Sequence, residues 1–309
     1  SVYFLAVGIF LMRLSGQGLM SHTCTTTISR YFNKSRGKAL STAWLGLSTA
    51  EFILPVLITY LFIIYTWNTI WQYISILTIL ILPLVILNTI SSVKLDSREE
   101  DINLNNKRKK IKNWKRIEVL KDFRFYIILL NTLAMPWIIT GVFVYQSFIS
   151  DSKLWSLYTI PKAIMFYSIT SILTLFISGF LIDKFTSRKL ILLMNIPLFF
   201  AMVILYFTKQ EFFAYIILSL IGISNGLSNV LGSSTWAEIY GVKYIGSIKA
   251  LTTSLMVFST AFGTAVFGIM IDNGFTIEII ASISGLYILA SFTLLTIFRK
   301  TLEPLKLVK

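Results

Sequence analysis

The chain has 309 residues, a formal net charge of +14 and 55% hydrophobic residues, but only 14% charged residues. Soluble domains carry nearer to 25% charged residues, so this composition excludes an ordinary soluble domain. A single Cys and a single His exclude a disulfide framework and argue against a metal centre, so we expect no metal and no cofactor. A basic excess suits nucleic acid only on a polar surface. The long apolar runs rule out such a surface, and we expect no nucleic-acid partner.

Nine apolar segments are long enough to cross a bilayer, for which a helix needs about 20 residues. Their apolar residues are continuous rather than alternating, which is typical of helices and not of membrane strands. The sequence therefore predicts an all-α polytopic protein with the lipid bilayer as its surroundings. The predicted spans are 2–28, 40–64, 69–92, 126–149, 157–182, 190–208, 212–238, 250–272 and 276–298.

Basic residues indicate how the spans are oriented. With nine spans, 24 of the 28 Lys and Arg fall in loops on one side, Lys249 being counted there just ahead of the eighth span. An excess of Lys and Arg marks the cytoplasmic side. We therefore expect a cytoplasmic C-terminus in a bacterial plasma membrane. No cleavable signal peptide is visible. The pattern divides the chain into three spans (1–92), a basic cytoplasmic linker (93–125) and a six-helix bundle with a short tail (126–309).

An internal repeat with an offset of 211 residues links the two parts. The segment Lys-Ala-Leu-Ser-Thr at 38–42 matches Lys-Ala-Leu-Thr-Thr at 249–253, and Ser-Thr-Ala at 48–50 matches the same three residues at 259–261. Each copy is predicted to cross the membrane from outside to inside and then to return, so the two copies have the same orientation. Membrane transporters often contain such duplications, so the repeat favours that class.

Two motifs resemble the major facilitator superfamily (MFS). The segment from Arg13 through GQGL and Arg-Gly-Lys (36–38) to a Gly/Ser/Thr-rich span is similar to the family's fourth and fifth helices. The stretch GFLIDKFTSRK from Gly179 resembles the loop signature that follows the eighth helix, with Ser187 in the place of the usual Gly. The resemblance implies two six-helix halves, of which this chain would hold helices four to twelve. On that expectation, the first three helices are missing.

Asp183, Lys184 and Arg188 of this signature are expected to form a conformational latch. Asp183 is predicted at a cytoplasmic helix end, where it can pair with a base or cap a neighbouring helix N-terminus. Such a contact would hold two helices together in the outward-open state. A solvated charged turn is the alternative interpretation.

Arg13 and Glu51 are the two clear charges inside predicted spans, where ionisable groups suggest a function. Their distances from the cytoplasmic ends put them at similar depth, so a buried pair is plausible. Gln17 shares the face of Arg13. Arg13 is a candidate for binding an anionic solute, and Glu51 for carrying protons. A purely structural ion pair is the alternative.

Polar residues on two further spans complete the candidate site. The span at 126–149 corresponds, by the resemblance, to the family's seventh helix and suggests a cavity lining that can hydrogen-bond or stack a small molecule. Helix packing with an interfacial aromatic belt explains the same residues equally well. The candidates are Asn131, Thr140, Tyr145 and Gln146 on this span, and Asn225, Asn229 and Trp236 on the span at 212–238.

The function that these features favour is secondary active transport of a small organic solute, anionic or zwitterionic, by alternating access. Proton coupling remains open, and the complete protein is expected to be a monomer. We expect no enzymatic activity, because one His and scattered acids do not form a catalytic cluster. The alternatives are a non-transporting receptor or scaffold of the same fold and, less favoured, a membrane-embedded transferase.

Overall fold

The computed structural model describes residues 2–32, 35–90, 112–156 and 158–304. Within these ranges the chain is helical and contains no strand. The basic linker expected at 93–125 therefore falls mostly outside the described residues. The elements are α1 (Val2–Met12), η1 (Arg13–Met20), α2 (Ser21–Tyr31), α3 (Arg36–Ile64), α4 (Trp67–Ile90), α6 (Arg116–Leu120), α7 (Phe123–Val144), α8 (Gln146–Lys153), α9 (Thr159–Phe185), α10 (Ser187–Leu190), η2 (Ile191–Leu193), α11 (Ile196–Phe207), α12 (Phe212–Tyr240), α13 (Ile245–Asp272), α14 (Ile277–Ile297) and η3 (Arg299–Leu302).

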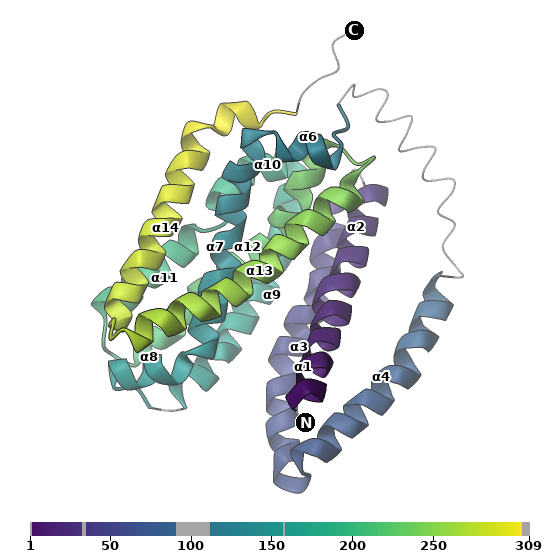
Figure 1. The fold of residues 1–309 in the computed structure, drawn as a ribbon. Coiled ribbons are helices and arrows are strands. Elements are labelled where there is room, and N and C mark those ends of the chain that lie inside the picture. The colour runs from purple at the N-terminus through teal and green to yellow at the C-terminus, as the bar shows by residue number, and fades with distance from the viewer. Residues whose placement is uncertain (1, 33–34, 91–111, 157, 305–309) are drawn as a thin grey trace.

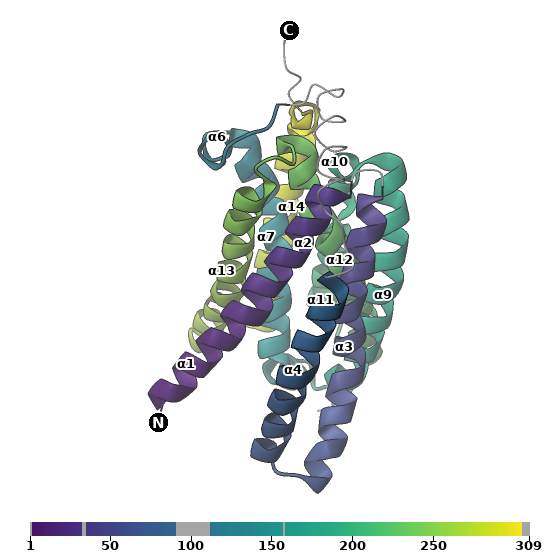
Figure 2. The same ribbon diagram turned by 90° about the vertical axis from the view of Figure 1, so that its right-hand side faces the viewer.

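The helices follow the apolar runs closely. Eight helices in the described part of the chain are long and apolar enough to cross a membrane. The remaining predicted span, 40–64, coincides with α3, which has 29 residues. The first span is one continuous rod in which α1, the π-helix η1 and α2 follow each other (Figure 2). The all-α polytopic class is thus confirmed.

Helices α7 to α14 form a bundle, and α1–α4 lie along one side of it (Figure 1). Helix α3 packs against α9 and α12, while α2 packs against α13. Helix α4 is joined to α3 by a turn and stands away from the bundle, with most of its apolar side chains exposed. Exposed apolar surface of this length suits contact with lipid.

Successive long helices run in opposite directions, so their connections gather at two ends (Figure 1). We call the end formed by residues 32, 35, 186–195 and 241–244 the basic end. Contacts across it join segments far apart in sequence: the Lys243 amide donates to Asn113, and Arg124 donates to the carbonyl of Glu303 at 3.0 Å. At the opposite end, Lys153 pairs with Glu278 at 2.8 Å. The arrangement matches the alternation expected from the basic loops.

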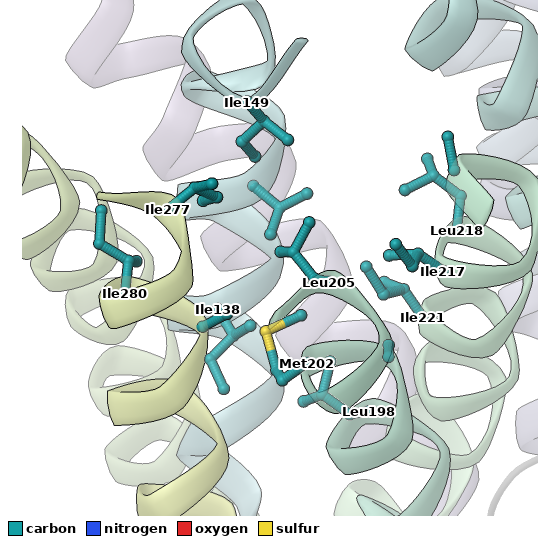
Figure 3. Close-up of a cluster of buried hydrophobic side chains, with 14 of the residues drawn as sticks. Ile138, Ile149, Leu198, Met202, Leu205, Ile217, Leu218, Ile221, Ile277 and Ile280 are labelled. Carbon is teal, nitrogen blue, oxygen red and sulfur yellow. The ribbon is translucent and has the colours of Figure 1, made fainter. Parts of the chain in front are cut away.

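Apolar side chains fill the bundle between α7, α11, α12 and α14. Figure 3 shows Ile138, Met202, Ile221 and Ile280 converging from these four helices. Inside a membrane the apolar surroundings give no hydrophobic drive to helix contact, so close van der Waals packing has to hold the bundle together. This cluster therefore holds α7, α11, α12 and α14 together, and two of these helices, α7 and α12, line the cavity described below.

Gly263 sets the spacing of α7 and α13. A Cβ at this position would overlap the backbone carbonyl of Trp137 on α7. We expect Gly263→Ala to lower the free energy of unfolding by about 1–3 kcal/mol, because the backbone on the facing helix has to move. The measurement is the thermal melting temperature of the detergent-purified protein.

Gly46→Ala on α3 is the matched control, since a Cβ there meets nothing within 4 Å in the described structure. It should leave stability unchanged or raise it slightly, because Ala is the better helix former. Equal melting temperatures for the two variants would contradict the proposed contact.

Candidate functional site

A cavity of about 540 Å³ lies between the two groups of helices. Its wall comes from η1, α2 and α3 on one side and from α7, α9, α12 and α13 on the other. Three aromatic side chains, Trp44, Phe143 and Tyr167, belong to that wall together with aliphatic and polar side chains. The lining includes Ser21, Thr25, Trp44, Glu51, Thr140, Phe143, Tyr167, Asn225, Asn229, Ser233, Lys249 and Thr252.

Three residues that line this cavity each have a buried polar atom without a hydrogen-bond partner in the described protein. They are Nε1 of Trp44, Oε2 of Glu51 and Nδ2 of Asn229. Buried polar groups are almost always satisfied, so such atoms call for an explanation. Two donors and one acceptor of residues that line the same cavity thus lack a protein partner, and a side-chain rotation would let a polar ligand satisfy them.

Four of the predicted site residues meet in the cavity. They are Glu51, Thr140, Asn225 and Asn229. The Thr140 hydroxyl already donates to the Pro136 carbonyl at 2.7 Å, and the Asn225 amide donates to the Ser171 hydroxyl at 3.1 Å. Of these four residues, Glu51 and Asn229 are the two that have a buried polar atom without a hydrogen-bond partner in the described structure.

Other predicted site residues lie elsewhere. Asn131 is buried between α7 and α11, where its carbonyl oxygen accepts from the Asn195 amide at 2.6 Å. Tyr145 donates its hydroxyl to the Thr264 carbonyl and stacks on Phe267. Both residues therefore take part in helix packing, which was the alternative interpretation of the span at 126–149. Trp236 also makes packing contacts: it is buried against the rings of Phe125 and Tyr240 at the basic end.

Gln146 begins α8 at the opposite end and is not among the cavity-lining residues of the described structure. Gln17 has a side chain outside the described residues. Polar composition thus predicts helices that do line the cavity, but it does not predict which face of each helix lines it.

Arg13 does not pair with Glu51 in the described structure. It lines a second cavity, of about 380 Å³, together with His22 and residues of α13 such as Ala250 and Val257. The reason is that the π-helix η1 begins at Arg13 and packs against α13. Arg13 and Glu51 therefore line different cavities in the described structure.

Asp183 caps a helix of the other group. Its two carboxylate oxygens accept from the backbone amides of Gly37, at 2.8 Å, and Lys38, at 3.3 Å, in the first turn of α3. A carboxylate at a helix N-terminus satisfies free amides and interacts favourably with the helix dipole. The close approach requires glycine, since a Cβ on Gly37 would press on the Gly179 carbonyl. This is the second of the two contacts predicted for Asp183.

Arg188 makes its contacts within the bundle. Its guanidinium lies 3.2 Å from Glu238 and 3.6 Å from Glu303. Lys184 is exposed, with its ammonium over the ring of the adjacent Phe185. Of the three predicted latch residues, Asp183 alone bridges α9 and α3 in the described structure.

Comparison with known proteins decides the family. A family model described as Major Facilitator Superfamily matches residues 1–264. The chain belongs to the Major Facilitator Superfamily. No curated protein matches it. Together with its apolar helices, the match shows an integral, multi-pass membrane transporter of the MFS.

In the structure, the residue at the glycine position of the MFS loop signature is Thr186, whereas Ser187 was expected from the sequence. Backbone φ is +76° at Thr186, whereas Ser187 starts the ordinary helix α10. Positive φ strains any residue with a Cβ, and a β-branched residue most of all. The position at which glycine would be favoured is therefore Thr186, three residues after Asp183.

Thr186→Gly is expected to stabilise the MFS protein by about 1 kcal/mol or more, because glycine adopts this backbone conformation without strain. Thermal melting in detergent measures the change. Thr186→Ala keeps a Cβ and serves as the control, which should show no comparable gain. If alanine stabilises as much as glycine, the explanation by backbone strain is wrong.

Lys249 is the cavity residue that sequence reasoning missed. It was assigned to a basic loop, but it lies in the second turn of α13 and is only 3% exposed. Helix α13 begins five residues earlier than the apolar run at 250–272, which brings the lysine inside. Its repeat partner Lys38 is exposed on α3 and lies over the ring of Phe180. The repeat alone therefore does not reveal the burial of Lys249.

Proposed function

We propose that this MFS protein carries out secondary active transport of a small organic solute, anionic or zwitterionic, by alternating access, and that Glu51 couples transport to protons. The observation that carries the proposal is the shared cavity with its three unsatisfied polar atoms. The cavity is formed by both groups of helices, so a relative movement of the groups would change access to it.

Contacts at the basic end support a conformation closed on that side. The Asp183 cap joins α9 to α3, and the Lys249 ammonium lies 3.2 Å from the Ser29 hydroxyl, joining α13 to α2. We infer that the basic end is cytoplasmic, because Lys and Arg gather in its loops. The C-terminus would then be cytoplasmic, and this conformation would face outward in a bacterial plasma membrane. The proposed working unit is a monomer.

Glu51 suits proton coupling because of where it lies. It is the acidic residue among those lining the cavity, and Tyr167 is within electrostatic range of it. A buried charge without a partner is unfavourable, so a carboxyl group in such a place exchanges between neutral and charged states as its surroundings change.

The test is uptake by the chain reconstituted in phosphatidylcholine vesicles. Radiolabelled organic acids and amino acids are supplied with and without an inward proton gradient, and protein-free vesicles correct for passive entry. Protein-dependent uptake that rises with the gradient is the expected result. Uptake that equals the protein-free rate for every solute would contradict transport, and uptake indifferent to the gradient would contradict proton coupling.

A further inference from the structure

Lys249 is a buried cation at the floor of the central cavity, on the side of the basic end. Its side chain lines the same cavity as Glu51. The one hydrogen bond described for its ammonium goes to the Ser29 hydroxyl at 3.2 Å, and Ser29 itself is fully buried. An ammonium has three hydrogens to donate. Two of them have no protein acceptor in the described structure.

The charges around Lys249 do not compensate it. The ion pairs of the described residues include none to Lys249. The ionisable groups within electrostatic range are Arg36, His22 and Cys24, and none of them is a carboxylic acid. Arg36 is itself within electrostatic range of Asp183 and Glu238. Those two acids make their contacts at the basic end, with the Gly37 amide and with Arg188. A buried cation is normally paired, because an unpaired one is unfavourable by several kcal/mol.

We propose that Lys249 binds the negatively charged group of the transported solute, and that the solute is a small organic anion with an apolar body. This inference rests on the proposed transport function and narrows its substrate class. The apolar body would lie against the aromatic wall formed by Trp44, Phe143 and Tyr167. A cavity of about 540 Å³ has the size of an ordinary small-molecule site.

Geometry favours an anion over a small zwitterion. Lys249 is the fifth residue of α13, while Glu51 is the sixteenth of α3, and both helices start at the basic end. At 1.5 Å per residue their Cα positions differ by about 16 Å along the helices. The charged groups of an amino acid are only a few ångström apart, so contact with both side chains would need both to extend toward each other, whereas an anion needs Lys249 alone. Lys249 therefore acts on the solute while Glu51 remains available to a proton.

The test compares two probes of nearly the same shape and different charge, benzoate and benzamide. The chain is placed in phosphatidylcholine nanodiscs at pH 7, and binding is followed by tryptophan fluorescence, since Trp44 lines the cavity. The wild type is expected to bind benzoate about tenfold more tightly than benzamide, the factor that one charge-assisted contact supplies. A wild type without this preference overturns the inference.

Three variants locate the effect. Lys249→Met should bind both probes equally, with benzamide binding showing that the cavity is intact. Lys249→Arg should keep the preference for benzoate. Lys162→Met removes an exposed lysine of α9 and should match the wild type. The inference fails if Lys249→Met still prefers benzoate. If this variant binds neither probe, Lys249→Arg decides: a lost preference there overturns the inference, and a retained one supports it.

Failure of this inference and failure of the proposed function are distinguishable. A charge preference that depends on Lys249, in a protein that takes up no solute, would contradict transport alone. Protein-dependent uptake of organic anions that is unchanged in Lys249→Met would contradict the role of Lys249 alone.

Discussion

Glu51→Gln is expected to abolish the response of uptake to a proton gradient. Glutamine keeps the size and hydrogen-bonding groups of the side chain but cannot exchange a proton, and Glu51 is the acid that lines the central cavity. The wild type should accumulate solute several-fold above its equilibrium level when the outside is acidic, whereas the variant should only equilibrate it. Vesicle uptake with and without the gradient measures this difference.

Two controls make the result specific. Exchange of labelled for unlabelled solute, which needs no net proton movement, should persist in Glu51→Gln and would show that the protein is folded. Glu278→Gln removes an acid at the opposite end, where it pairs with Lys153, and should keep the response to the gradient. A Glu51→Gln protein that still accumulates solute under the gradient would remove Glu51 from the coupling mechanism.

Asp183→Asn is expected to shift the protein away from the conformation closed at the basic end. The carboxylate receives two backbone amides of α3, and hydrogen bonds to a charged group contribute about 1.5–3 kcal/mol each. An amide side chain offers one neutral acceptor oxygen in place of two charged ones. Loss of about 2 kcal/mol changes the ratio of the two conformations roughly thirtyfold.

The measurement is labelling of a single introduced cysteine at Ser41, which is 5% exposed on α3 near the basic end, in a background with Cys24→Ser. A membrane-impermeant maleimide applied from the basic side should react faster in Asp183→Asn than in the parent. Lys184→Gln is the control, because the exposed Lys184 makes no contact with α3 among the described residues. Equal labelling rates for Asp183→Asn and the parent would contradict the latch.

Much of the architecture could be predicted because the bilayer imposes it. Continuous apolar runs give the long helices, and the alternation of basic loops gives their directions. Asp183 could also be predicted, since a carboxylate at a helix end has few ways to be satisfied, and the structure contains one of the two that were considered. Glu51 stood out by the same reasoning, as an acid inside a span.

The composition of the site could be predicted only in part, because a residue list does not fix the rotation of a helix about its axis. Asn131 and Asn225 look alike in sequence, yet one packs against Asn195 and the other lines the cavity. The π-helix η1 turned Arg13 toward α13, and no regular helical period shows that change. Lys249 was missed for a third reason: the helix begins five residues before the apolar run that predicted it, and those residues decide between a loop and the interior.

The Asp183 cap has a consequence for how the transporter responds to its surroundings. Both donors are main-chain amides, so the contact involves no second side chain that could be lost by mutation or that changes its charge. Changing a population from 1:99 to 99:1 takes about 5.5 kcal/mol, which is the order of two such bonds. We therefore expect this carboxylate, on a fixed scaffold, to contribute a constant part of the bias toward the conformation closed at the basic end, beside the contact of Lys249 with Ser29. A solute that binds Lys249 would then act on one of these two contacts while the Asp183 cap stays in place.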